Sequence, residues 1–296
     1  MIEGVLLLAA GAGAGLFGSL LGLGGGILIV PLLTLAFGLP LLTAVGISLI
    51  CVIVTSSAAA GVYLERRVAN LRLGMTLELF TAGGAMVGGL VAFLLPERLL
   101  EGLFTALLGY VAITMARRRD PPPAVPAGAA LPQAPQVPVR AADAEDVARG
   151  DAAVAPSPEG PERAFVDQLS GPGYRVHRLG FALIGSVFAG VASALLGIGG
   201  GLIKVPVMHV VMGVPLRVAT ATSNLMIGIT ASASAIIYLV RGGIDPYAAA
   251  PTAIGVFLGA SVGSRIASRI DLRLLRGLFV AILLYTAWQM LQRAIA

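Results

Sequence analysis

The stretch AGLFGSLLGLGGGILIVPLLTLAFGLPL, residues 14–41, returns as AGVASALLGIGGGLIKVPVMHVVMGVPL at residues 189–216. A constant shift of 175 residues aligns the glycine triplet 24–26 with the triplet 199–201. The shift also pairs Ser48 with Ser223, Thr55 with Thr230, and Tyr63 with Tyr238. The chain therefore contains an internal duplication, and each half carries three consecutive glycines inside an apolar run. Glycine interruptions at matching places in two membrane halves are typical of a transporter's substrate site.

The composition predicts a polytopic, all-α membrane protein. Hydrophobic residues make up 57% of the chain and charged residues 12%, whereas soluble domains carry about 25% charged residues. Apolar runs long enough to cross a hydrocarbon core of about 30 Å recur along the chain. The net charge of +5 comes mainly from arginines at the ends of apolar runs. Such arginines anchor helices and set their topology, so the charge does not indicate binding to nucleic acid.

The apolar segments are unequal in length, and the segment after each glycine triplet is short. About thirteen helical residues span only about 20 Å, so these two segments are expected to be half-helices. Counting each glycine-linked pair as one broken unit gives four units per half and about eight transmembrane helices. The apolar segments are 4–21, 26–38, 41–64, 73–95 and 99–116 in the first half, and 179–197, 201–214, 217–240, 247–268 and 275–292 in the second.

Three domains are expected: a first transmembrane repeat at 1–118, a linker at 119–177 and a second repeat at 178–296. The linker holds most of the prolines and few large apolar residues, so it is predicted to be disordered and to act as a tether. Arginines at both linker ends indicate the cytoplasmic side. A second arginine cluster in 265–276 falls outside in a parallel arrangement and inside in an inverted one, so both topologies stay open.

Isolated and consecutive glycines are expected to have different roles. Glycines spaced four apart predict close packing of helix backbones in lipid; they are Gly11 and Gly15, Gly18 and Gly22, Gly84 and Gly88, and Gly255, Gly259 and Gly263. Three consecutive glycines are unstable as helix, and unwound backbone at membrane depth must line a cavity or be buried in protein. Each triplet precedes a half-helix whose N-terminus attracts anions. The triplets therefore predict an anion site between the halves, with close helix crossing as the alternative.

A few polar residues inside the apolar runs are candidates for the same site. Lys204 is the only lysine, and it either pairs with an anionic substrate or extends to a nearby interface. Ser48, Ser223 and Asn224 are expected to line the site, because hydroxyls and amides suit an oxyanion that must bind and leave. Glu78 could relay protons. The predicted substrate-binding residues are Gly24, Gly25, Gly26, Gly199, Gly200, Gly201, Lys204, Ser48, Ser223 and Asn224.

Other kinds of site are less well supported by the sequence. His209 stands alone in its run, so core packing is expected for it and no metal site is predicted. Asp245 precedes Pro246 and is expected to cap a helix, because aspartate commonly occupies that position. The chain has no P-loop or HExxH motif, so ATP-driven transport and zinc-dependent hydrolysis lack their residues. No catalytic residue or cofactor is predicted.

The duplicated motif G-x-G-G-G-[IL]-[LI]-x-V-P, followed by G-[LV]-P and a serine-bearing helix, resembles the TauE/SafE family of sulfite and organosulfonate transporters. The resemblance covers both halves but not the linker. It implies about eight helices in two related halves and a multi-pass exporter of a small sulfur-containing anion in the cell inner membrane. The implied partners are the anion, the lipid bilayer and a coupling proton or ion. Transport of a carboxylate or other metabolite, and a non-transporting assembly or sensor protein, remain alternatives.

Overall fold

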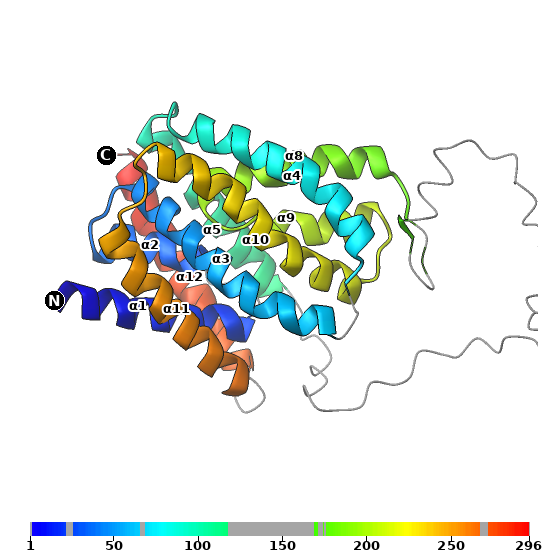
Figure 1. Ribbon diagram of the computed structural model, residues 1–296. Helices are drawn as coiled ribbons and strands as arrows, with labels where there is room; N and C mark the ends of the chain where they lie inside the picture. Colours follow the sequence, from blue (N-terminus) through cyan, green and yellow to red (C-terminus); the bar gives the residue numbers. More distant parts are fainter. Residues whose placement is uncertain are drawn as a thin grey trace, which may run out of the picture.

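The computed structural model describes residues 2–21, 26–65, 69–117, 169–170, 174, 176–266 and 272–295. All regular elements in this part of the chain are helices, and no strand is assigned to it (Figure 1). The first half contains α1 (Ile2–Leu21), α2 (Gly26–Ala36), α3 (Leu41–Glu65), α4 (Leu71–Ala92) and α5 (Glu97–Arg117). The second contains α8 (Leu179–Leu196), α9 (Gly201–Pro206), the π-helical η1 (Val207–Val211), α10 (Leu216–Val240), α11 (Pro246–Ile266) and α12 (Leu272–Ile295).

The helix starts follow the duplication in the sequence. α2 and α9 begin at residues 26 and 201, and α3 and α10 begin at 41 and 216. α4 and α11 begin at 71 and 246, and α5 and α12 begin at 97 and 272. Each pair differs by 175, which is the shift that aligns the two glycine triplets. That the chain divides into two repeat domains, 1–118 and 178–296, stays a prediction.

Both segments after the glycine triplets are short helices, for a reason visible in the sequence. α2 has 11 residues, and α9 and η1 together form a helical stretch from Gly201 to Val211. Gly38, with φ of +67°, follows the first, and Gly213, with φ of +73°, follows the second. Because this left-handed backbone is unfavourable for residues with a Cβ, the two glycines end the short helices at matching places.

Four helices of the described chain are long and apolar enough to cross a membrane. They are Ile2–Leu20, Leu71–Ala92, Leu179–Leu196 and Val218–Val240. The segments Gly26–Ala36, Leu41–Ser57 and Gly201–Val211 are apolar but shorter. An all-helical protein with several membrane-length helices is therefore confirmed, whereas the count of eight transmembrane helices stays a prediction.

The most extensive helix contacts join one half of the chain to the other. α1 packs along α11, α4 along α8, α5 along α12, and α3 along α10. Figure 1 shows α4 beside α8 at one edge of the bundle and α1 beside α11 at another. The short helices α2 and α9 pack mainly on α3 and α10 of their own halves. Two interleaved groups result: α1, α2, α3 and α11 form one, and α8, α9, α10 and α4 form the other.

Glycines allow these close helix crossings. A Cβ on Gly259 would collide with the backbone carbonyl of Ala12 in α1, and a Cβ on Gly84 would collide with that of Val187 in α8. Both helix pairs therefore approach to backbone contact, as expected for small residues at membrane helix interfaces. The packing role predicted for the spaced glycines is confirmed at Gly11, Gly15, Gly84, Gly88, Gly255, Gly259 and Gly263.

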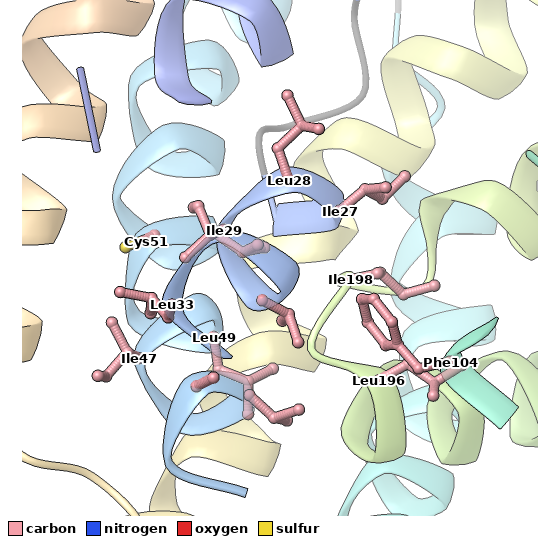
Figure 2. Close-up of a cluster of buried hydrophobic side chains, with 14 of the residues drawn as sticks. Ile27, Leu28, Ile29, Leu33, Ile47, Leu49, Cys51, Phe104, Leu196 and Ile198 are labelled. Carbon is pink, nitrogen blue, oxygen red and sulfur yellow. The ribbon is translucent and has the colours of Figure 1, made fainter. Parts of the chain in front are cut away.

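Apolar side chains fill the centre of the bundle. Figure 2 shows Ile29 and Leu33 of α2 beside Ile47 and Leu49 of α3, and all four side chains are fully buried. Ile29 stands in the duplication where Lys204 stands in the second half. The two halves therefore differ at this position: an isoleucine inside the apolar core corresponds to a lysine.

The end of the predicted linker is part of the folded structure. Leu169 is 2% exposed and Val176 is also buried, within a cluster that includes Leu73 of α4 and Met208 of η1. The Asn70 side chain donates hydrogen bonds to the Leu169 carbonyl and the Tyr174 hydroxyl, and its oxygen accepts from the backbone N–H of Leu73. These linker residues are thus fixed at the start of α4. The disorder predicted for the preceding residues, 119–168, lies outside the described residues.

Candidate functional site

The start of α2, at the last glycine of the first triplet, lies against the end of α8. Gly24 and Gly25 lie outside the described residues, but Gly26 begins α2. A Cβ on Gly26 would lie 2.8 Å from the carbonyl oxygen of Gly197, which ends α8. The Ser48 hydroxyl lies 2.8 Å from that oxygen and 3.2 Å from the Gly26 carbonyl. The Ser48 hydroxyl therefore links the start of α2 to the end of α8 through two backbone carbonyls, and its proton is already used in a hydrogen bond.

The second interruption has a backbone that favours glycine. Gly199 has a φ of +74° and Gly200 a φ of +72°. A Cβ on Gly200 would lie 3.1 Å from the Ala189 carbonyl oxygen and 3.6 Å from Cε of Lys204. The lysine side chain therefore passes directly beside the unwound backbone, within the group formed by α4, α8, α9 and α10.

Two serine hydroxyls beside this interruption are buried and have no hydrogen-bond partner among the residues that the structure describes. They belong to Ser193 on α8 and Ser223 on α10. A Cβ added to Gly201 would lie 3.5 Å from the Ser223 Oγ. A Cβ added to Gly200 would lie 3.3 Å from the Ser193 Cβ. Buried polar groups normally have partners, so each exception calls for an explanation. Two such donors at one interruption suit a ligand that accepts hydrogen bonds.

Lys204 forms a buried network with Glu78 and Thr230. Its Nζ lies 2.8 Å from Oε2 of Glu78 and donates to the Thr230 hydroxyl. That hydroxyl in turn donates to Oε1 of Glu78 at 2.6 Å. Lys204 is 2% exposed and Glu78 is 4% exposed. The lysine therefore does not extend to an interface, and its charge is paired with a carboxylate contributed by the other half of the chain.

The remaining predicted residues are placed as follows. Asn224 lies next to Ser223 on α10, and its backbone carbonyl accepts a hydrogen bond from Ser56 on α3 at 2.7 Å. Asp245 caps α11 as predicted, because its Oδ1 accepts from the backbone N–H of Tyr247 at 3.0 Å. The expectation that His209 packs in the core is wrong: the residue is exposed on η1, and its Nδ1 lies 2.9 Å from the Val214 carbonyl.

A metal centre finds no support in the described ranges. No group of three or more histidine, cysteine, aspartate or glutamate side chains there could hold an ion.

Sequence reasoning missed two features of this site. It noted Glu78 and Lys204 separately, although ionisable residues inside a membrane usually pair with one another. The pairing rule could have connected them despite their separation of 126 positions in the sequence. Ser193 gave no such signal, because its counterpart in the duplication is Gly18 and single serines are common in membrane helices.

Comparison with known proteins assigns the chain to a family. The family profile described as "Sulfite exporter TauE/SafE" matches residues 7–290. The chain is similar to the "Probable membrane transporter protein YunE" of Bacillus subtilis (strain 168), with 25% identity over 272 residues and 88% of each chain covered. No solved structure matches the chain significantly. The chain therefore belongs to the TauE/SafE family and is a multi-pass membrane transporter.

Proposed function

We propose that the protein exports a small sulfur-containing anion, such as sulfite or an organosulfonate, across the cell inner membrane. The observation that carries the proposal is the group of unused donors at the second glycine interruption. Ser193 and Ser223 are buried without partners, and the Lys204 side chain passes beside Gly200. The family is one of sulfite exporters, and the similar Bacillus subtilis protein is a probable membrane transporter; both agree with transport.

The donor set favours a compact oxyanion over a long amphiphile. Hydroxyl groups and the N–H groups of unwound backbone can each donate one hydrogen bond to an anionic oxygen. A lysine ammonium supplies a full positive charge with three donors. Because the donors come from α8, α9 and α10, a ligand with several oxygens around a small centre satisfies more of them than an extended chain does.

Binding and counterflow measurements with the serine variants test this proposal. The full-length protein is reconstituted in liposomes, and exchange of labelled sulfite is measured for wild type, Ser193→Ala and Ser223→Ala. Loss of a hydrogen bond to a charged group costs about 1.5–3 kcal/mol, so half-saturation should rise by about ten-fold or more. Neither variant should lose stability, because neither hydroxyl has a partner.

The matched control is Ser232→Ala on the same helix as Ser223. The Ser232 hydroxyl donates to the Gly228 carbonyl within α10 at 2.8 Å, so its removal should leave sulfite exchange unchanged. Equal half-saturation in all four proteins would refute the site. Exchange of carboxylates in place of sulfite and sulfonates would favour the alternative cargo. Absence of any flux would favour a non-transporting assembly or sensor protein.

A further inference from the structure

The ion pair between Lys204 and Glu78 poses a problem for anion binding. The Lys204 ammonium is already neutralised by the carboxylate at 2.8 Å, and both side chains are buried. A monovalent anion entering this network would bring two negative charges to one positive charge. An excess charge buried inside a membrane protein is costly. Lys204 can therefore hold an anion only if the negative charge on Glu78 is removed.

Addition of one proton restores the charge balance. The resting network contains Lys204 as a cation and Glu78 as an anion, with a net charge of zero. Entry of a monovalent anion together with one proton leaves Lys204 paired with the new anion and Glu78 as a neutral carboxylic acid. The net charge is again zero. One O–H bond forms on Glu78, and one ammonium–carboxylate contact is exchanged for an ammonium–anion contact.

We propose that Glu78 is the proton-binding site that couples proton movement to anion movement, one proton for each monovalent anion, through competition for Lys204. The inference rests on the proposed function, because it assumes that an anion reaches Lys204. Glu78 acts through the lysine and does not itself contact the anion. It is thus a coupling residue and not a ligand.

Thr230 lets the network accept the added proton. Its hydroxyl donates to Glu78 at 2.6 Å, and the Met226 carbonyl lies 3.2 Å from the same hydroxyl as a second acceptor. When Glu78 becomes an acid, Thr230 can donate to Met226 and accept the new O–H of Glu78. The hydrogen bond between Thr230 and Glu78 then reverses direction without a change of partner.

No other described charge competes for Glu78. Helix α8, which packs along α4, contains no ionisable residue. Arg72 on α4 and His209 on η1 are exposed. Tyr238 on α10 is engaged elsewhere, because its hydroxyl donates to the Ala194 carbonyl at 2.9 Å.

The duplication supplies a single such network in each chain. The shift of 175 residues aligns Lys204 with Ile29, Thr230 with Thr55, and Glu78 with Ala253. The matching group in α2, α3 and α11 therefore retains the threonine but lacks both charges. One coupled proton per transport cycle follows from this asymmetry, although the chain contains two related halves.

The test counts protons during anion binding to the full-length protein. Methanesulfonate is the probe, because a sulfonate stays ionised between about pH 5.5 and about pH 8.5, whereas sulfite titrates in that range. A pH indicator in weakly buffered detergent solution should report uptake of about one proton per bound anion. Methanesulfonate affinity should fall by up to about ten-fold per pH unit as the pH rises, as proton linkage requires.

Glu78→Gln removes the titrating group and Glu101→Gln is the matched control on α5. The first variant should bind methanesulfonate without proton uptake and with an affinity independent of pH, and it should retain anion exchange but lose accumulation driven by a proton gradient. The second should behave as wild type. The wild-type proton count decides the question by itself if Glu78→Gln does not fold.

Three results overturn the inference, and they can be told apart. Methanesulfonate binding without proton uptake in wild type, or unchanged proton uptake in Glu78→Gln, refutes coupling while leaving the anion site intact. No binding of methanesulfonate or sulfite to wild type at any pH refutes the proposed function, and the coupling with it.

Discussion

Replacing Lys204 by methionine is the most informative perturbation of this fold. Methionine keeps most of the length of the side chain and removes the charge and the donors. The Glu78 carboxylate would then remain buried without the ammonium that lies 2.8 Å from it. Breaking a buried ion pair in this way costs about 3–5 kcal/mol, whereas replacing both partners is often nearly neutral.

The size of the effect can be worked out independently from protonation. The simplest escape for an unpaired carboxylate is to take up a proton. The ordinary pKa of a glutamate side chain in an unfolded chain is about 4.3. Protonating such a side chain at pH 7 costs about 3.7 kcal/mol, at about 1.36 kcal/mol per pH unit. The destabilisation caused by Lys204→Met should thus be about 3–4 kcal/mol at pH 7. It should shrink by about 1.4 kcal/mol for each pH unit on lowering the pH toward 5.

A double-mutant cycle measures this coupling. Unfolding free energies are determined in mixed detergent micelles for wild type, Lys204→Met, Glu78→Gln and the double variant. Each single variant leaves one buried charge unpaired, so the double variant should be less destabilised than the sum of the singles by about 3 kcal/mol. Additive effects, or a Lys204→Met penalty that does not change with pH, would refute the argument that the pair is a buried, mutually neutralising unit.

Three further changes probe other parts of the structure. Gly259→Ala places a Cβ against the Ala12 backbone carbonyl and should lower stability by about 1–3 kcal/mol. Gly13→Ala is the control, because a Cβ there would have no atom within 4 Å, and it should not lower stability. Equal melting temperatures of the two variants would contradict the close approach of α1 and α11. Thr230→Val removes a hydroxyl that is hydrogen-bonded to two charged groups, so it should lower the unfolding free energy by about 1–3 kcal/mol. Thr230→Ser should be closer to wild type, and calorimetric unfolding of both variants measures the difference. Deletion of residues 124–163 should leave membrane insertion and sulfite exchange nearly unchanged, and loss of exchange at normal expression would contradict the tether role.

The sequence predicted the helical elements of the molecule well, because the patterns that indicate them lie within short stretches of the chain or are repeated in both halves. Long apolar runs predicted helices, and the glycine triplets predicted the two short helices that follow them. Spaced glycines predicted close helix contacts, as found where Gly84 meets Val187. These signals depend on a residue and its near neighbours. These local patterns did not predict that α4 packs along α8, because an apolar helix face in a membrane does not specify which other helix it packs against.

The site was predicted less completely because it depends on contacts between distant residues. Lys204 was identified as unusual, but its partner lies on a helix of the other half. Ser48 and Ser223 looked equivalent from the duplication, yet Ser48 bonds to backbone carbonyls and Ser223 has no partner. Related halves can thus place matching serines in different surroundings, and sequence alone does not distinguish them.

The interleaving of helices bears on how such a protein can arise and be assembled. Because α4 packs mainly on α8 and α1 mainly on α11, a polypeptide containing one half leaves its glycine-lined faces uncovered. A half-length ancestor could have covered them only by pairing with a second copy of itself, as an intertwined dimer. Fusion through a tether makes that encounter intramolecular, at an effective concentration on the order of millimolar. It also frees each copy to change independently, which is how one half can acquire a lysine and the other a glutamate.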